Sequence, residues 1–347
     1  MNLRSALLLA IPASLLAAWL EAPPILVFLL SCIAVLPLAG IMGEATEHLA
    51  ARTGPTVGGF LNATFGNAAE LIIAVVALRA GLVQLVKASI TGSILGNLLL
   101  ILGLSLVVGG TKRETLTFNR TAAGMSAGML ALAVVGLVLP ALFHTLHPVG
   151  SEAVELRMSM GVAVILLATY AASLLFSLRT HRRLFGGDPH PADGARYPTG
   201  KALTLLGLAT VGVAVESEVL VHAVQGVTAT LGWSETFLGL IIIPLIGNAA
   251  EHVTAIVVAR KGQTDLALQI ALGSSTQVAL LVAPLLVFIA LLLGKPMNLA
   301  FSTFEVVAVA LSTLVVSISV LDGESNWFEG VQLLAVYLMV AVAAFFI

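Results

Sequence analysis

The chain has 347 residues, of which 10% are charged and 59% are hydrophobic. An ordinary soluble domain has about 25% charged residues. A globule of this length cannot bury so large an apolar fraction, so lipid must cover much of the surface. The net charge of −2 gives no basis for nucleic-acid binding. The single cysteine, Cys32, excludes an internal disulfide and a cysteine-based metal cluster.

Apolar stretches of roughly twenty residues, the length that a helix needs to cross a bilayer, recur along the chain. The first of them also fits a signal peptide, because Arg4 precedes an apolar run that ends near Glu21-Ala22. We interpret it as a helix, and whether residues 1–20 are retained stays open. The sequence therefore predicts an all-α integral membrane protein with about eleven transmembrane helices, at 3–20, 25–50, 56–79, 84–109, 120–143, 158–179, 201–225, 235–259, 265–293, 302–320 and 327–347.

The distribution of lysine and arginine predicts the orientation. The longest connection, residues 180–200, is rich in glycine and proline and indicates an exposed loop between two halves. With the N-terminus inside, twelve cations fall on one face and four on the other, which makes the first face cytoplasmic and puts the C-terminus outside. The twelve are Arg4, Arg52, Lys112, Arg113, Arg120, Arg179, Arg182, Arg183, Arg196, Lys201, Arg260 and Lys261, and the four are Arg79, Lys87, Arg157 and Lys295.

An internal repeat appears when the sequence is shifted by 181 residues. The block Gly-Asn-Ala-Ala-Glu at 66–70 then aligns with the same block at 247–251, and 14 of the 35 positions from 66 to 100 are identical. The first block lies on the third predicted span and the second on the eighth, and because this difference of five is odd, the two copies cross the membrane in opposite directions. Inverted repeats are typical of transporters whose substrate site lies near the midplane. We predict an N-terminal helix (1–20), a first five-helix repeat (25–179), a cytoplasmic loop (180–200) and a second repeat (201–347).

Glu70 and Glu251 end the two blocks and fall near the centre of their predicted spans. A carboxylate at this depth costs several kcal/mol unless it is neutralised, paired or bound to a metal, so function is the default interpretation. The alternative is a protonated glutamate with a structural role. A glutamate ends the same five-residue block in both copies, and this repetition favours the functional interpretation.

The residues around these glutamates supply oxygen ligands. The Gly-Asn pair before each glutamate weakens its helix, Pro244 removes a further backbone hydrogen bond, and the freed carbonyls can bind a cation. A flexible site of carboxylates, carbonyls and amides suits Ca²⁺ better than Mg²⁺. A bound cation and protons compete for carboxylates, so two glutamates could exchange about two protons for one Ca²⁺. The candidate secondary ligands are Asn67, Ser93, Asn97, Asn248, Ser274 and Gln277.

Further ionisable residues are candidates for proton coupling or gating. Thr46-Glu47 and Ser217-Glu218 occupy matching places in the two halves, near the inner and the outer end of their helices, with Glu44 and Glu216 close by. The shared [Ser/Thr]-Glu pair favours Glu47 and Glu218, although solvated acids at helix ends are an alternative. His252 follows Glu251 in the second copy only, where it could relay protons or serve as a buried structural histidine.

The paired blocks, the second followed by His252, resemble the signature of the cation/proton exchanger family of calcium/cation antiporters. The resemblance extends from Thr46-Glu47 to the last helix, and the family has eleven spans. It implies a Ca²⁺/H⁺ antiporter in which Glu70 and Glu251 bind the ion, and a prokaryotic inner membrane suits the short loop. The family's acidic loop is missing here. The resemblance also implies that Asn67, Ser93, Asn248, Ser274 and Gln277 line the pathway and that Glu47 and Glu218 serve its outer reaches.

Three other functions fit the sequence less well. A Na⁺-driven Ca²⁺ exchanger usually has Gly-Thr-Ser-type blocks, and a cation channel would not need inverted repeats around a midplane site. An intramembrane metalloprotease needs H-E-x-x-H or H-x-x-E-H spacing, which the residues around Glu47 and Glu251 do not provide. We therefore predict no enzymatic activity and no cofactor, with Ca²⁺ and H⁺ as substrates and lipid as the surrounding partner. The sequence does not separate Ca²⁺ from Mn²⁺ or Cd²⁺, and it does not give the oligomeric state.

Overall fold

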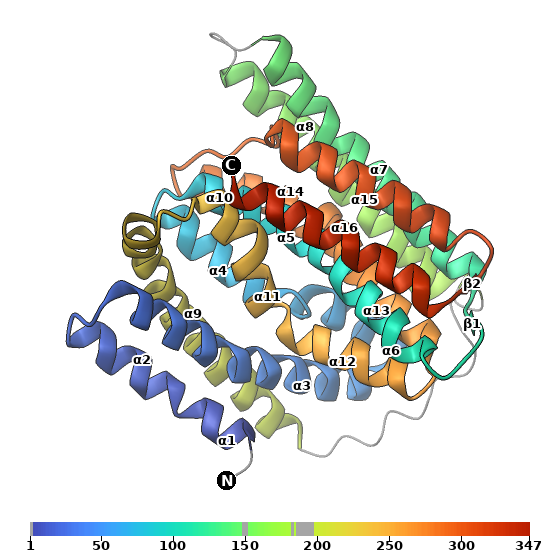
Figure 1. Ribbon diagram of the computed structural model, residues 1–347, viewed down its shortest axis with the longest axis horizontal. Coiled ribbons are helices and arrows are strands. Elements are labelled where there is room, and N and C mark those ends of the chain that lie inside the picture. Colours follow the sequence, from blue (N-terminus) through green and yellow to red (C-terminus); the bar gives the residue numbers. More distant parts are fainter. Residues whose placement is uncertain (1–2, 148–151, 182–183, 185–197) are drawn as a thin grey trace. The chain divides into compact units, whose positions relative to one another are not determined.

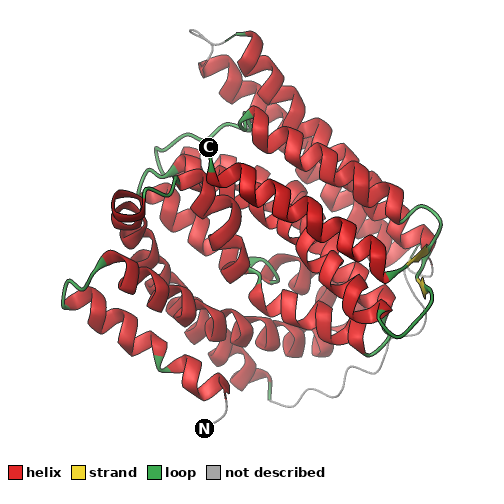
Figure 2. Cartoon of the chain, in the orientation of Figure 1, coloured by secondary structure: helices red, strands yellow, loops and turns green. Residues whose placement is uncertain are grey.

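The structure is a computed structural model that describes residues 3–147, 152–181, 184 and 198–347. Figure 2 shows that these residues are nearly all helical, as the apolar stretches predict. The only strand pairing among them joins β1 (Leu116–Thr117) to β2 (Glu324–Ser325) in antiparallel register. Most of the predicted loop at 180–200, with Arg182, Arg183 and Arg196, lies outside the described residues.

The chain divides into two compact units, and each of them takes part of both predicted repeats. The first unit contains residues 1–89 and 188–250, and the second contains residues 90–187 and 251–346. Two helices, α5 (Val83–Leu95) and α12 (Ala249–Arg260), run from one unit into the other. The two repeats thus contribute their N-terminal parts to the first unit and their C-terminal parts to the second.

The core of the first unit lies where α3 (Pro24–Phe65) packs along α9 (Thr199–Leu231) (Figure 1). Gly212 on α9 makes room for the side chain of Leu38, since a Cβ at Gly212 would lie 2.8 Å from Leu38 Cδ2. The other helices of this unit are α1 (Leu3–Leu8), α2 (Ala10–Trp19), α4 (Ala68–Arg79), α10 (Glu235–Phe237), the π-helical η4 (Leu238–Ile242) and α11 (Ile243–Gly247).

Helix α3 covers the predicted span 25–50 and the first part of the predicted span 56–79, up to Phe65. Residues eight apart in a straight helix are separated by about 12 Å. A Cβ on Gly58, however, would lie 2.3 Å from the carbonyl oxygen of Ala50. The helix must therefore bend sharply between these residues, and the part that is long and apolar enough to cross a membrane ends at Thr53. The gap between the two predicted spans, at 51–55, thus corresponds to this bend and not to a loop.

In the second unit, α6 (Leu102–Gly110) and α16 (Trp327–Phe345) cross with their backbones in contact. A Cβ on Gly330 would lie 2.6 Å from the carbonyl oxygen of Gly103, and one on Gly103 would lie 2.9 Å from the carbonyl oxygen of Gly330. Small residues at a crossing allow this close approach, which is how helices associate in lipid. The remaining helices of this unit are η1 (Gly96–Ile101), α7 (Arg120–Leu146), α8 (Glu152–Leu175), η2 (Phe176–Thr180), α13 (Thr264–Gln277), η5 (Val278–Val282), α14 (Ala283–Leu292) and α15 (Thr303–Ser319).

Seven helices within the described residues are long and apolar enough to cross a membrane, and an eighth span results if α10–α11 and α12 are counted together. The segments Ala6–Trp19 and Thr303–Ser319 are apolar but shorter. Helix α4 has only 12 residues because the chain breaks at Gly66-Asn67. The count of eleven spans, the inverted repeats and their boundaries therefore stay predictions.

Candidate ion-binding site

The first Gly-Asn-Ala-Ala-Glu block breaks the helix one turn before its glutamate, as predicted. Helix α3 ends at Phe65, Asn67 has φ −99° and ψ 24°, and α4 begins at Ala68. Glu70 is the third residue of α4 and is buried. The unsatisfied N–H groups at the start of a helix favour a carboxylate there. The break therefore provides a partly compensated position for a buried acid.

The second block repeats this local structure. Helix α11 ends at Gly247, Asn248 has φ −92° and ψ 5°, and α12 begins at Ala249. The chain turns by 61° at this break. Glu251 is again the third residue of the new helix, and its carboxylate accepts a hydrogen bond from the hydroxyl of Ser274 on α13. The partner Ser274 was one of the predicted oxygen ligands.

Glu70 lies directly against the second block. A Cβ on Gly247 would lie 3.1 Å from Cγ and 3.6 Å from Cδ of Glu70. The glycine is therefore needed for the close approach of α11 to the Glu70 side chain. Sequence reasoning treated Gly247 as a residue that weakens its helix and missed this contact. Glu70 belongs to the first unit and Glu251 to the second, so their meeting in one site stays a prediction.

His252 and Asn97 form a second buried contact. His252 Nε2 lies 3.2 Å from Asn97 Oδ1. Because the amide oxygen accepts, Nε2 carries the hydrogen in this contact. Asn97 lies in η1, a π-helical segment of the kind often found at functional sites. This contact links the residue that follows Glu251 to a predicted ligand of the first repeat.

The remaining predicted ligands are buried or partly buried. Ser93 on α5, Asn67 before α4 and Asn248 before α12 are buried. Gln277, the last residue of α13, is partly buried. Their part in ion binding stays a prediction.

The acids on α3 and α9 have very different surroundings. Glu44 and Glu47 on α3 are exposed. Glu218 on α9 is also exposed and forms an ion pair with Arg79, with Nη1 and Oε1 3.3 Å apart. The cation count puts Arg79 on the outer face, and Glu218 was predicted near the outer end of its helix, so the pair agrees with that depth. The matching depth and the opposite charges of Arg79 and Glu218 were the sequence signals from which this ion pair could have been predicted.

Glu216, two residues earlier on α9, is fully buried. Its two carboxyl oxygens lie 2.8 and 2.7 Å from the hydroxyl of Ser14 on α2. The sequence favoured Glu218 over Glu216 as the proton-coupling residue, and that preference stays a prediction. The sequence could not reveal the Ser14 contact, because Ser14 is an isolated polar residue in an apolar run.

Replacing Ser14 by alanine is expected to destabilise the protein. The change leaves the buried carboxyl group of Glu216 without this hydrogen bond, which costs about 1–3 kcal/mol. We expect a lower Tm in detergent by differential scanning fluorimetry. Ser31→Ala is the matched control, because the buried Ser31 hydroxyl donates to the backbone carbonyls of Val27 and Phe28 in its own helix. Equal effects of the two changes would contradict the proposed importance of the contact.

Comparison with known proteins places the chain in a family. The profile of the sodium/calcium exchanger protein family matches residues 23–179 and 201–346. A Ca²⁺/H⁺ antiporter of Aphanothece halophytica is 44% identical over 98% of this chain and 95% of its own length. The Ca²⁺/H⁺ antiporter ChaA of Bacillus subtilis is 43% identical over 96% of each chain.

Solved structures agree with this relationship. The structure of native YfkE covers 99% of this chain and 100% of its own, with a TM-score of 0.87 and 39% identity. The crystal structure of the H⁺/Ca²⁺ exchanger CAX shares the fold, with a TM-score of 0.72 at 16% identity over 99% of this chain and 91% of that one. The resemblance inferred from the paired blocks is thus confirmed. The chain belongs to the sodium/calcium exchanger protein family, and the relatives named here are Ca²⁺/H⁺ antiporters.

Proposed function

We propose that this chain is a secondary antiporter that exchanges Ca²⁺ for H⁺ across a membrane by alternating access, with Glu70 and Glu251 binding Ca²⁺ and protons in turn. The observation that carries the proposal is the matching local structure of the two blocks. In each block an asparagine in nearly the same conformation interrupts the helix, and a glutamate follows as the third residue of the next helix. Relatives named Ca²⁺/H⁺ antiporters that match nearly the whole chain support the same function.

The chemistry follows from what a carboxylate can bind. Glu251 with the hydroxyl of Ser274, and Glu70 beside the Gly247-Asn248 break, offer oxygen ligands of the kind that Ca²⁺ prefers. The same oxygens bind protons when the cation leaves, so protons and Ca²⁺ compete. Two carboxylates carry two negative charges, which are neutralised either by one Ca²⁺ or by two protons. His252, Glu47 and Glu218, with Glu44 and Glu216, are the proposed groups through which protons reach or leave the site.

The finer architecture is part of this proposal. We infer eleven spans, with two inverted repeats around the two glutamates, a cytoplasmic N-terminus and an outer C-terminus in a prokaryotic inner membrane. The π-helical segments η1 (Gly96–Ile101) and η5 (Val278–Val282) start at positions that nearly coincide after the shift of 181 residues, which supports the repeat. Such an arrangement places the glutamates near the midplane, where inverted-repeat transporters bind their substrates.

Flux measurements in proteoliposomes test the function. We expect uptake of radioactive calcium to be driven by an imposed pH gradient and to stop when an ionophore collapses that gradient. Uptake driven by a Na⁺ gradient at equal pH would instead identify the Na⁺-driven exchanger. Uptake that follows the Ca²⁺ gradient alone and ignores both other gradients would identify a channel.

Gly247→Ala is expected to weaken Ca²⁺ transport without unfolding the protein. The new methyl group would press on the Glu70 side chain, which must move by a few tenths of an ångström. Overpacking of this kind costs about 1 kcal/mol or more, so the apparent affinity for Ca²⁺ should fall several-fold. The measurement is the KM for Ca²⁺ in the proteoliposome assay. Gly207→Ala on α9, where no atom lies within 4 Å of the added Cβ, should leave KM unchanged. An unchanged KM for Gly247→Ala would contradict the role of Glu70.

A further inference from the structure

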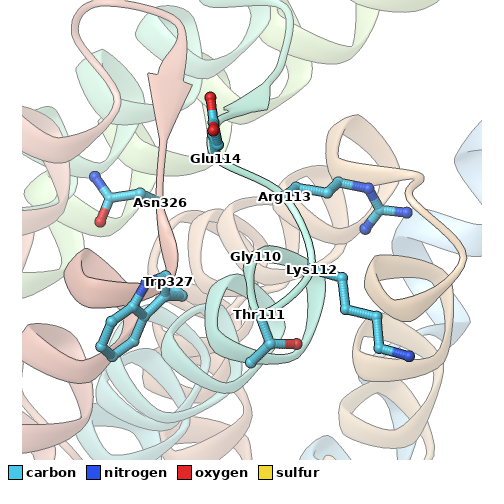
Figure 3. A pocket seen from close by; sticks show the side chains of 7 residues that line it. All are labelled: Gly110, Thr111, Lys112, Arg113, Glu114, Asn326 and Trp327. Carbon is cyan, nitrogen blue, oxygen red and sulfur yellow. The ribbon is translucent and has the colours of Figure 1, made fainter.

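An open hollow of about 550 Å³ lies where α6 ends and α16 begins (Figure 3). It is lined by Gly110 at the end of α6, by residues 111–114 that follow it, and by Asn326 and Trp327. The membrane-spanning helix Val83–Gly110 ends at this hollow, and the span Trp327–Phe345 begins there. The hollow therefore lies at the depth where apolar helices meet the lipid headgroups.

Cations gather on two adjoining turns at this level. Lys112 and Arg113 follow α6 and are exposed. Arg260 is the last residue of α12, Lys261 follows it, and both are also exposed. The two turns touch, since a Cβ on Gly262 would lie 2.6 Å from Arg113 Nη2. All four cations belong to the face that the lysine and arginine count assigns to the cytoplasm.

The hollow is shaped by close packing. Arg113 Nη1 donates a hydrogen bond to the carbonyl oxygen of Gly109 at 2.7 Å. Gly262 has φ +83°, a conformation that favours glycine, and its missing side chain leaves room for the guanidinium group. Arg113 is thus held in place by one of its five N–H groups while others can still bind a ligand.

Trp327, the aromatic residue that lines the hollow, is also held in place by close packing. A Cβ on Gly110 would lie 2.8 Å from the backbone nitrogen of Trp327, so the start of α16 packs closely on the end of α6. Trp327 lines the hollow and is 49% exposed. Tryptophan is enriched where a membrane meets water, because its ring is apolar and its N–H is polar.

Two acids near the hollow, Glu114 and Glu329, are directed or bonded elsewhere. In Figure 3 the Glu114 carboxylate points upward, whereas Lys112 and Arg113 extend to the right, on the side away from Trp327 and Asn326. Glu329, one turn into α16, accepts hydrogen bonds from the hydroxyl of Ser325 at 2.9 Å and from the amide of Asn326 at 3.0 Å.

We propose that this hollow binds the phosphate headgroup of an anionic glycerophospholipid, such as phosphatidylglycerol or cardiolipin. Lys112 and Arg113 contact the phosphate, Arg260 and Lys261 add to the attraction, and Trp327 lies at the boundary between headgroup and acyl chain. A lipid fits better than a soluble phosphate because the hollow opens beside the ends of apolar helices. The site does not depend on which ion the protein transports.

Quenching of Trp327 fluorescence measures this binding directly. The chain has three tryptophans, so Trp19→Phe with Trp233→Phe leaves Trp327 as the fluorophore. The full chain is reconstituted in neutral phosphatidylcholine, with an equal fraction of brominated phosphatidylglycerol or brominated phosphatidylcholine. We expect the anionic lipid to quench more strongly. Lys112→Gln, which leaves the bond from Arg113 to Gly109 in place, should lower the preference about fivefold, and Lys112→Arg should restore it.

Arg157→Gln is the matched control, because it removes an exposed cation assigned to the other face of the membrane. It should keep the full preference for the anionic lipid. Equal quenching by the two lipids, or an equal loss in the Lys112 and Arg157 variants, would overturn the proposal. So would loss of the preference on adding inorganic phosphate at constant ionic strength, because the ligand would then be a soluble anion. An unchanged elution volume in size-exclusion chromatography verifies that each variant is folded.

Discussion

Replacement of Glu251 or Glu70 by glutamine is expected to abolish Ca²⁺ uptake driven by a pH gradient. The amide keeps the shape of the side chain and can still accept a hydrogen bond from Ser274, but it neither balances the charge of Ca²⁺ nor exchanges a proton. Losing one partner of a buried charge interaction costs about 2–5 kcal/mol, so uptake should fall by about 30-fold or more. The measurement is the initial rate of radioactive calcium uptake in proteoliposomes at a fixed pH gradient.

Two further variants make this result specific. Glu324→Gln makes the same change at an exposed residue of β2 and should leave uptake unchanged. Glu251→Asp keeps the carboxylate and should retain part of the activity. If either glutamine variant still exchanged Ca²⁺ for protons at the normal rate, that glutamate would not be an ion ligand. The folded state of each variant can be verified by its elution volume, so loss of uptake cannot be confused with loss of protein.

Gly330→Ala is expected to lower the stability of the protein substantially. Because α6 and α16 touch through their backbones at Gly103 and Gly330, the new methyl group would lie 2.6 Å from a carbonyl oxygen and 2.8 Å from the backbone nitrogen of Val107. Backbone atoms cannot turn away as a side chain can, so the two helices must separate. Overpacking of this kind costs about 1–3 kcal/mol. We expect a clear fall in Tm in detergent.

Gly128→Ala on α7 is the control for this experiment. Gly128 is exposed, and no atom lies within 4 Å of the added Cβ. Alanine is the better helix former, so this change should leave Tm unchanged or raise it slightly. A Gly330→Ala protein as stable as the Gly128→Ala protein would show that α6 and α16 do not depend on this close crossing.

The sequence alone determined the class of fold and the place of the helix breaks. The excess of apolar residues predicted a helical membrane protein, because only a helix or a closed barrel satisfies its backbone hydrogen bonds in lipid. The Gly-Asn pairs predicted the interruptions before Glu70 and Glu251, and both are confirmed. These features depend on residues close together in the chain, so local patterns were sufficient to reveal them.

The tertiary structure decided which side chains meet. The contacts of Ser14 with Glu216, of Gly247 with Glu70 and of Ser274 with Glu251 join residues on different helices. In a soluble helix the polar face shows which side is exposed, but a helix in lipid can be apolar all round. The rotation of each helix about its axis, and the crossing of its neighbours, are therefore not written in the hydrophobic pattern. Close packing at glycines and hydrogen bonds between helices fix them instead.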